Sequence, residues 1–379
     1  MTAERHTVAL YVGGLLGPLG GGVTAVMLPE LAASLHVSIA TAGTALTAYF
    51  VPFAALQLVS GTLGERWGRQ RVTRTAYVAY VLASLLCAVA TAAPVFLLGR
   101  VLQGLANAFT TPLLVAGLAE LVAAERLSRS LGLFGACQAA GQSLAPLVGG
   151  VANALSWRWA FVAVAAVAAV LALLPPRGDP RPGVHAPRFR ALVTRRMALI
   201  SAAGFASYAG GAGLPFLVSL LAERRFGTRD AVVGFVVVGF GVAGILLART
   251  WGVVSGRIGA ATATAIGLVG GGLAVAAVGV SRPLAVLVVT WTVAGAFSSL
   301  ATVGLQNLGA REVPTNRGGA VSVVSAFRFT GGAVAPLLWL PLYPAHGDPT
   351  AVFVAAGAVA VAGGLVAVLL LVRKRPGTV

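Results

Sequence analysis

The chain has 379 residues, of which 58% are hydrophobic and only 10% are charged. Soluble domains are about 45–50% apolar and about 25% charged, so this composition excludes a soluble globular protein and indicates one that lipid solvates. The net charge of +17 does not indicate nucleic-acid binding, because nearly all arginines lie in short connections between apolar stretches and form no continuous basic face.

The apolar stretches predict an all-α integral membrane protein. Stretches such as Val8–Leu28 and Ile39–Gly64 exceed the roughly 20 residues that a helix needs to cross a bilayer. Division at charges, prolines and polar loops predicts twelve transmembrane helices, at residues 8–29, 39–62, 72–93, 95–120, 129–154, 159–175, 197–222, 229–250, 260–280, 284–309, 318–340 and 350–372.

The basic residues predict the orientation of these spans. Most of the 27 basic residues fall on the same side as both chain ends, and the positive-inside rule places that side in the cytoplasm. Lys374 is the sole lysine among them, a composition that favours a GC-rich bacterial genome. The sequence therefore predicts a multi-pass protein of the bacterial inner membrane with both termini cytoplasmic.

A basic, proline-rich segment divides the spans into six and six. Residues 175–196 read as a cytoplasmic linker between an N-terminal bundle, 1–174, and a C-terminal bundle, 197–379. The octet that starts at Gly61 recurs at Gly252, and the Gly-x-x-x-Ala-Pro pattern of Gly141 recurs at Gly331, at offsets of 191 and 190 residues. These repeats predict two pseudo-symmetric six-helix bundles.

The connection after the second span carries a dense motif of glycines and charges. Its sequence is Gly61-Thr-Leu-Gly-Glu65-Arg66-Trp-Gly68-Arg69-Gln-Arg71. The glycines permit a tight turn and close approach of helices. The carboxylate of Glu65, at the membrane edge, can pair with nearby arginines and with the positive N-terminal end of another helix.

The fourth span carries a polar stripe. It contains Arg100, Gln103, Gly104 and Asn107, and the side chains of Arg100, Gln103, Asn107 and Thr111 share one helical face. Lipid would not tolerate that stripe, so it should face a wet cavity or a partner helix. The alternative is that Arg100 extends to the outer membrane surface.

The fifth span carries small residues at helical spacing together with a proline. Small residues let helices approach closely, and a proline removes one intrahelical hydrogen bond and allows a bend. A pure packing role is the alternative to a functional one. The motif consists of Gly132, Gly141, Ala145, Pro146, Gly149 and Gly150.

These three motifs resemble those of the major facilitator superfamily, and more closely those of its twelve-helix drug/proton antiporter branch. The loop motif is similar to G-x-L-a-D-r-x-G-r-r, with Glu65 in place of Asp, and the fourth-span motif is similar to R-x-x-q-G-x-g-a. The fifth-span motif is similar to G-x8-G-x3-G-P-x2-G-G, with Ala145 in place of a glycine. The resemblance implies a loop that latches the cytoplasmic sides of the two halves together, and export rather than import. It is weaker over residues 197–372, where Gly256 stands at the position of Glu65.

The charges within the spans predict the class of substrate. All ten acidic residues lie near predicted span ends, whereas Arg100 and Arg328 lie within spans. If the first, fourth, seventh and tenth spans line a cavity, as the resemblance implies, that cavity is neutral to positive. We therefore hypothesise a neutral or anionic lipophilic substrate, with both arginines as donors and Tyr49, Tyr208 and Trp291 as aromatic faces.

Arg328 falls close to the bilayer centre, where an arginine costs about 2.5–3.5 kcal/mol on insertion scales. Such a side chain needs a partner. The alternative to a substrate contact is therefore pairing with backbone carbonyls, or with Gln138 or Gln142 across the bundle.

Proton coupling and helix bending have weaker signals. The first span has no carboxylate between Glu4 and Glu30, so Glu30 is the candidate for proton coupling, and its alternative is a solvated charge at a helix end.

Glycines precede a proline in two corresponding spans, at Gly20–Gly22 before Pro29 and at Gly210–Gly213 before Pro215. Such clusters permit bending, and close helix packing is the alternative.

The sequence thus predicts a secondary active transporter that exports small amphipathic compounds by alternating access, through proton-coupled antiport. The alternative is a metabolite importer or facilitator on the same fold. No catalytic set of side chains and no metal-binding cluster appears, so we expect neither an enzyme nor a cofactor beyond a proton gradient. The expected partners are a small-molecule substrate and the lipid bilayer, with no nucleic acid, and we expect a monomer.

Overall fold

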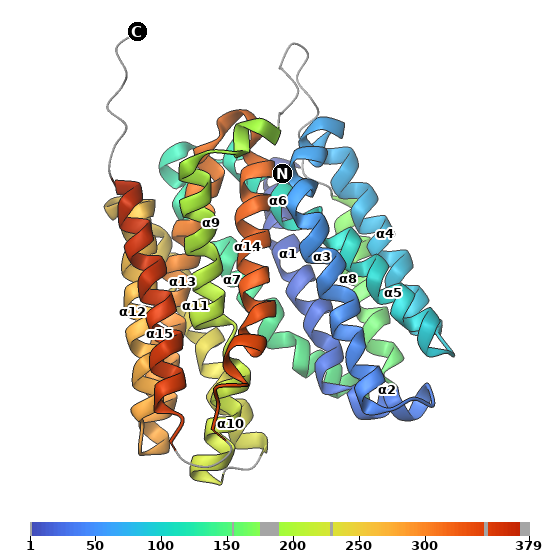
Figure 1. Ribbon diagram of the computed structural model, residues 1–379. Coiled ribbons are helices and arrows are strands. Elements are labelled where there is room, and N and C mark those ends of the chain that lie inside the picture. Colours follow the sequence, from blue (N-terminus) through green and yellow to red (C-terminus); the bar gives the residue numbers. More distant parts are fainter. Residues whose placement is uncertain (1, 154, 175–188, 228–229, 345–347, 372–379) are drawn as a thin grey trace. The chain divides into compact units, whose positions relative to one another are not determined.

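The structure, a computed structural model, describes residues 2–153, 155–174, 189–227, 230–344 and 348–371. These residues form helices and no strand (Figure 1). In chain order the elements are α1 (Thr2–Gly22), η1 (Val23–Val26), α2 (Leu28–Ser34), α3 (Ile39–Trp67), α4 (Arg69–Val89), α5 (Ala93–Asn107), α6 (Thr110–Leu121), α7 (Ala124–Asn153), α8 (Arg158–Leu173), η2 (Phe189–Leu192), α9 (Arg195–Ser207), η3 (Tyr208–Ala212), α10 (Pro215–Phe226), α11 (Asp230–Ile258), α12 (Ala260–Val280), α13 (Leu284–Glu312), η4 (Pro314–Asn316), α14 (Arg317–Trp339), α15 (Thr350–Val368) and η5 (Leu369–Leu371).

Each predicted span overlaps one helix or a broken pair of helices. Nine helical stretches of the described residues are long and apolar enough to cross a membrane, and Val8–Gly22 and Arg158–Leu173 are shorter apolar helices. Large apolar side chains face outward, among them Leu246 (74% exposed) and Leu82 (63% exposed), as expected of a surface solvated by lipid tails. The prediction of an all-α membrane fold is confirmed.

Breaks interrupt the first and seventh spans where glycines and prolines predict bending. The α-helix of the first span ends at Gly22, and α2 begins at Leu28 with Pro29 in its first turn. The seventh span passes from α9 through η3, a π-helix, into α10, which begins at Pro215. A proline is accepted in a first turn because its missing N–H would have no intrahelical partner there.

The chain forms two compact units that are not identical with its sequence halves. Unit 1 contains Met1–Ala123, Cys137–Ala191 and Pro314–Val323, and unit 2 contains Ala124–Ala136, Leu192–Val313 and Val324–Val379. The first turns of α14 therefore belong to unit 1, and the first turns of α7 belong to unit 2. The predicted linker at 175–196 lies largely outside the described residues, and the domain boundaries given above stay predictions.

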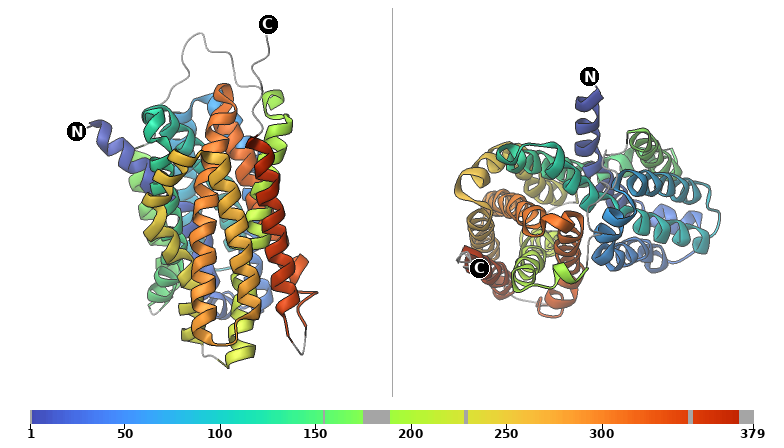
Figure 2. Two further views of the ribbon diagram at one scale, coloured as in Figure 1. Left: turned by 90° about the vertical axis from the view of Figure 1, so that its left-hand side faces the viewer. Right: turned by 90° about the horizontal axis from the view of Figure 1, so that it is seen from above.

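The helices of the two units have corresponding neighbours. In unit 1, α4 packs against α5 and α8, and in unit 2, α12 packs against α13 and α15 (Figures 1 and 2). A glycine marks the contact of α3 with α5 and that of α11 with α13. A Cβ added to Gly104 would lie 2.1 Å from the Tyr49 carbonyl oxygen, and one added to Gly295 would lie 2.2 Å from that of Phe240. Both pairs are related by the 191-residue offset of the sequence repeat.

Each unit has its own apolar core. In unit 1, the rings of Phe96, Trp157 and Phe161 pack edge to face with centroids 5.3 to 5.9 Å apart. In unit 2, the buried Trp291 packs on Phe240 with ring centroids 4.6 Å apart. Packing within each unit therefore fixes the helices that position the polar groups described next.

Candidate functional site

The turn between α3 and α4 brings the charges of the loop motif together. Gly68 separates the two helices with a φ of +94°, a conformation that a residue without a Cβ adopts at little cost. Gly259 separates α11 and α12 in the same way, with a φ of +87°. The turn in unit 1 places Glu65 one helical turn from Arg69, whereas Arg66 is exposed.

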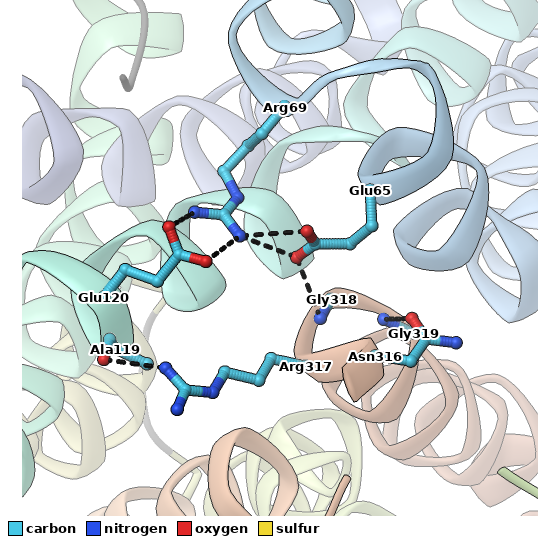
Figure 3. A network of polar contacts seen from close by, with 8 residues as sticks. All are labelled: Glu65, Arg69, Ala119, Glu120, Asn316, Arg317, Gly318 and Gly319. Atoms are coloured by element: carbon cyan, nitrogen blue, oxygen red, sulfur yellow. Dashed lines mark hydrogen bonds and ion pairs between the residues drawn. The ribbon is translucent and has the colours of Figure 1, made fainter. Parts of the chain in front are cut away.

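Arg69 is the centre of a charged cluster in unit 1. Its side chain is 3% exposed, and its Nη2 lies 2.8 Å from Oε1 and 3.0 Å from Oε2 of Glu65. The same guanidinium donates to both oxygens of Glu120, from Nη1 at 2.9 Å and from Nη2 at 3.1 Å (Figure 3). One buried cation thus joins a carboxylate at the end of α3 to a carboxylate near the end of α6.

The first turn of α14 contacts this cluster. The backbone N–H of Gly318 donates to Glu65 Oε1 at 3.3 Å, so the carboxylate lies at the positive end of the helix (Figure 3). Arg317 Nη1 donates to the Ala119 carbonyl oxygen at 3.0 Å. We call the cluster of Glu65, Arg69 and Glu120, together with the contacts of Gly61, Thr62, Glu65 and Ala119 with residues 316–322, the α14 network.

Close backbone contact completes the α14 network. A Cβ added to Gly61 would lie 1.9 Å from the Gly318 carbonyl oxygen, so only glycine allows this approach. Ser322 Oγ accepts a hydrogen bond from the Gly61 N–H at 3.2 Å and donates to the Gln57 carbonyl oxygen. Asn316 Nδ2 donates to Thr62 Oγ1 at 2.9 Å. The motif therefore holds the start of α14 through both charge and shape.

A second network, in unit 2, surrounds the first turns of α7. A Cβ added to Gly132 would lie 2.3 Å from the Ala248 carbonyl oxygen, and one added to Gly252 would lie 2.7 Å from the Arg129 Cα. Ser128 Oγ accepts a hydrogen bond from Asn307 Nδ2. We call the contacts of Ala124–Gly132 with these residues and with Arg311, which donates to the Ala124 carbonyl oxygen at 2.8 Å, the α7 network.

The remainder of the fifth-span motif packs within unit 1. A Cβ added to Gly141 would lie 2.3 Å from the Leu15 carbonyl oxygen, and Ala145 is fully buried against Gly22. Gly149 is buried as well. Pro146 and Gly150 lie in α7, and their side-chain surroundings are outside the described residues.

Arg100 is fully buried in unit 1, and its guanidinium donates hydrogen bonds to oxygens of the protein. Nη1 donates to the Gly20 carbonyl oxygen at 2.9 Å and to Gln103 Oε1 at 2.7 Å, Nη2 donates to the Gly21 carbonyl oxygen at 3.3 Å, and Nε donates to that of Ala45 at 3.3 Å. The predictions that Arg100 offers donors to a substrate, or extends to the outer surface, are therefore wrong. Arg100 instead holds the carbonyls at the end of α1.

The other members of the fourth-span stripe also bond within unit 1. Gln103 Nε2 donates to Ser84 Oγ at 2.7 Å, and Asn107 Oδ1 accepts a hydrogen bond from Thr110 Oγ1 at 2.9 Å. Gly104 contacts the backbone of α3, as described above. The stripe therefore faces partner helices, which is one of the two environments that its sequence predicts.

Two predicted aromatic faces belong to the cores. Tyr49 is 1% exposed, its hydroxyl donates to the Gly17 carbonyl oxygen at 3.1 Å, and its ring lies 4.5 Å from Arg100 Cζ. Trp291 is fully buried, and its Nε1 donates to the Val237 carbonyl oxygen at 3.3 Å. The prediction that these two rings line a cavity is wrong, because helix packing covers both.

Arg328 differs from the other buried arginines in its partners. It is 6% exposed on α14, and its Nη2 donates to Tyr208 Oη at 3.2 Å and to Thr302 Oγ1 at 3.3 Å. The Tyr208 ring lies 4.9 Å from its Cζ, and Gly204 leaves room for its side chain. Its Nε has no partner among the described residues. The partners are hydroxyls rather than the carbonyls that were the alternative.

The remaining predicted residues, Gln138, Gln142 and Glu30, belong to unit 1. Gln138, half-buried, and Gln142, exposed, belong to unit 1, whereas Arg328 belongs to unit 2. Glu30 is exposed in the first turn of α2, the position that a solvated helix-end charge would take. Its role in proton coupling stays a prediction.

The family profile described as Major Facilitator Superfamily matches residues 10–221 and 199–379, which together span nearly the whole chain. The chain belongs to the major facilitator superfamily. Membership makes it a multi-pass membrane protein of a family of transporters, which are not enzymes, that act on small molecules.

Several relatives in the superfamily match part of the chain. EfpA, an MFS-type transporter of Mycobacterium tuberculosis, is 33% identical over 160 residues, which cover 40% of this chain and 29% of EfpA. The puromycin resistance protein of Streptomyces alboniger is 33% identical over 177 residues, covering 46% and 35%. The methylenomycin A resistance protein of Bacillus subtilis is 29% identical over 157 residues, covering 41% and 34%. The chain thus spans about a third of the length of these relatives.

Solved structures of the superfamily share the fold over nearly the whole chain. The human organic anion transporter MFSD10 has a TM-score of 0.80 at 16% identity, covering 97% of this chain and 100% of that one. The proton:xylose symporter XylE has a TM-score of 0.79 at 15% identity, covering 96% and 94%. This likeness establishes the major facilitator fold.

Sequence reasoning missed several members of the two networks. Glu120 was seen only as an acidic residue at a span end, and its role depends on a contact 51 residues away along the chain. Asn316 had a detectable signal, because asparagine is favoured before a helix and its Oδ1 accepts the Gly319 N–H at 3.0 Å. Ser128 of the α7 network, and Thr302 beside Arg328, are common residues whose partners lie 179 and 26 residues away along the chain, so no local pattern marks them.

Proposed function

We propose that the protein exports small amphipathic compounds that are neutral or anionic, by alternating access and proton-coupled antiport. Two of the matched relatives are named for resistance to the antibiotics puromycin and methylenomycin A, which supports export. The resemblance of the fifth-span motif to the exporter pattern supports the same direction. In this proposal both termini are cytoplasmic and the membrane is the bacterial inner membrane.

The observation that carries the substrate class is the charge of the buried side chains. Among the described residues, the buried charged side chains are Arg69, Arg100 and Arg328, and no carboxylate is buried. Two carboxylates neutralise Arg69, and carbonyl and amide oxygens surround Arg100. Arg328 has two hydroxyls instead, and it forms no ion pair among the described residues.

An uncompensated arginine in the middle of a membrane helix favours a ligand that accepts hydrogen bonds. Burial of the charge costs about 2.5–3.5 kcal/mol on insertion scales, and an acceptor-rich or anionic group would offset part of that cost. Tyr208 adds an aromatic face beside the guanidinium, which suits a flat apolar compound. A cationic compound would find no buried carboxylate among the described residues.

Transport from inverted membrane vesicles tests this proposal. Vesicles energised to an inside-acid gradient should accumulate anionic and neutral amphipathic compounds, and an uncoupler should abolish the accumulation. Arg328→Ala should reduce accumulation of the anionic compounds about tenfold, the effect expected when a hydrogen bond to a charged group is lost. Arg328→Lys should retain part of the accumulation because the charge stays. Arg249→Ala, which removes an exposed arginine of α11 in the same unit, is the matched control and should change little.

Three outcomes would contradict the proposal. Unchanged accumulation in Arg328→Ala would remove Arg328 from the substrate site. Accumulation of cationic compounds alone would reverse the substrate class. Uptake that persists with the uncoupler would exclude proton antiport and favour a facilitator.

A further inference from the structure

Unit 1 contains a long apolar groove on α4 that none of the preceding contacts uses. Its volume is about 920 Å³, and α3, α4 and α5 line it. Its lining includes the small side chains Ala76, Ala79 and Ala83 of α4, and also Leu82 and Leu102, which are 63% and 41% exposed. The groove is therefore open to the lipid side of α4 along its length.

One end of the groove carries a positive charge and an indole ring. Arg71 and Trp67 line it there, Arg71 is exposed, and Trp67 is 58% exposed. Arg71 forms no ion pair among the described residues, while the nearest carboxylate in sequence, Glu65, is engaged by Arg69. Arginine and tryptophan are the side chains that typically lie at the level of lipid headgroups.

The dimensions of the groove fit a lipid tail. Its lining on α4 runs from Arg71 to Leu86, which is about 22 Å of helix at 1.5 Å per residue. The hydrocarbon layer of one leaflet is about 15 Å thick. A chain that starts at Arg71 would thus lie in the groove along the whole depth of one leaflet.

Unit 2 fills the corresponding place with a side chain. The repeat offset relates Ala79 to Gly270 and Ala106 to Phe297. The Phe297 ring covers Gly270 so closely that an added Cβ would lie 2.6 Å from its Cδ1. In unit 1 both positions are alanines and the space is open. The groove is therefore a specific feature of unit 1 rather than a consequence of the fold.

We propose that this groove binds one acyl chain of an anionic phospholipid, with the headgroup at Arg71 and Trp67. The positive charge of Arg71 favours an anionic headgroup. An exposed arginine with no acidic partner attracts the phosphate, and an anionic phospholipid such as phosphatidylglycerol has no positive group for it to repel. The apolar lining holds the tail. The inference is independent of the proposed substrate, since the groove and Arg328 lie in different units.

Fluorescence quenching by brominated lipids tests the proposal. The full chain would be reconstituted in nanodiscs that contain brominated phosphatidylglycerol or brominated phosphatidylcholine at matched mole fractions. The signal of Trp67 is obtained by comparison with Trp67→Phe. Phosphatidylglycerol should occupy the site with about fivefold higher apparent affinity, the factor that one basic residue near a membrane surface typically contributes.

Two pairs of variants separate charge from shape. Arg71→Ala should reduce the preference to parity, whereas Arg74→Ala, an exposed arginine of α4 that does not line the groove, should retain it. Ala106→Phe should fill the groove as Phe297 does in unit 2 and abolish quenching by both lipids. Val78→Phe, on an exposed position of α4 outside the groove, is its control.

The proposal fails if both lipids quench Trp67 equally in the parent protein, or if Arg71→Ala retains the preference. It also fails if folded Ala106→Phe binds phosphatidylglycerol as the parent does, because the lipid would then lie elsewhere. If Ala106→Phe does not fold, the two arginine variants decide, since both change exposed side chains that leave the packing intact.

Discussion

The α14 network and the α7 network hold corresponding helix starts by different chemistry. In unit 1, buried Arg69 joins Glu65 and Glu120, and Glu65 accepts a hydrogen bond from the first turn of α14. In unit 2, the position of Glu65 is Gly256, and no ion pair among the described residues contacts the first turns of α7. Close contacts of Gly132 and Gly252 hold those turns instead, with hydrogen bonds from Asn307 to Ser128 and from Arg311 to the Ala124 carbonyl oxygen.

The difference shows that one backbone design can serve two mechanical roles. Both networks place a glycine with positive φ between two helices and a second glycine against a neighbouring helix. Close packing of small residues has a fixed geometry and responds little to salt or charge. A charge-based contact responds to protonation, ionic strength and neighbouring charges. We therefore expect the α14 network to be the contact that opens and closes during transport.

Removal of Arg69 should lower the stability of the protein more than any other substitution predicted below. Arg69→Ala gives unit 1 the residue that unit 2 has at the corresponding position, Ala260, and leaves two carboxylates without their cation. The free energy of unfolding should fall by about 3 kcal/mol, the lower end of the range for one partner of a buried pair, because Glu120 is 41% exposed. The midpoint of thermal unfolding in detergent measures it.

The matched control for that experiment is Arg66→Ala. Arg66 is exposed in the same motif, so its loss should change the free energy of unfolding by less than about 0.5 kcal/mol. Equal effects of the two variants would show that the motif acts through its net charge and not through the buried cluster.

Added methyl groups should separate the glycines that permit close approach from those that do not. Gly61→Ala and Gly132→Ala place a Cβ 1.9 and 2.3 Å from a carbonyl oxygen, so each should lower the free energy of unfolding by about 1–3 kcal/mol. Gly256→Ala meets only Ser128 Cβ, at 3.6 Å, and should be neutral or stabilising because alanine favours the helix. Thermal unfolding of the three variants gives the ranking, and a destabilised Gly256→Ala would contradict it.

Cysteine labelling should show which network opens when its charge is removed. In a background where Cys87 and Cys137 are replaced by serine, Ser322→Cys reports the α14 network and Ser128→Cys reports the α7 network, since both serines are buried. Glu65→Gln keeps an acceptor but loses the charge, which weakens the hydrogen bonds by about 1 kcal/mol. The rate of maleimide labelling in the Ser322→Cys variant should therefore rise about fivefold, the factor that corresponds to that loss.

Labelling of the Ser128→Cys variant is the internal comparison for that measurement. Glu65→Gln should leave its rate unchanged, because the hydrogen bonds of Glu65 lie within unit 1 and the α7 network belongs to unit 2. A parallel rise in both variants would show that the loss of the charge loosens the whole protein and would refute a separate role for the α14 network.

The sequence predicted the fold well because its signals are local. Apolar run length marks each span, and Gly68 marks the turn that brings Glu65 and Arg69 together. The sequence also predicted the kind of partner that Glu65 has, the N-terminal end of a helix, because that positive end attracts a carboxylate. The identity of that helix was not foreseeable, because Gly318 lies 253 residues away along the chain.

The sequence failed where a polar residue had two possible environments. Arg100 and Tyr49 fit a wet cavity and a packed helix interface equally well in sequence, and only the carbonyls at the end of α1 decide between them. Those carbonyls become available because the glycines near Gly22 break the helix. Trp291 is hidden by Phe240 for a similar reason of long-range packing. The residue types do not show which backbone carbonyls are free to accept hydrogen bonds. The polar stripe of the fourth span was therefore interpreted as a binding site.

The smallest predicted effect concerns a paired carboxylate of unit 2, Asp348. Hydrogen bonds from the Thr350 hydroxyl and backbone N–H, with Arg225 2.6 Å away, lower the pKa of Asp348 from its ordinary value. A lowered pKa in the folded state stabilises the protein above the unfolded pKa of about 3.9, and this contribution is lost as the pH falls through the folded value. Asp348→Asn should therefore lower the unfolding midpoint slightly at pH 7, and the gap to the parent should close as the pH falls through the lowered pKa of Asp348. Glu223→Gln changes another exposed carboxylate of unit 2, one that forms no ion pair among the described residues, and is the matched control. A gap for Asp348→Asn that persists in acid would assign its effect to lost packing rather than to charge.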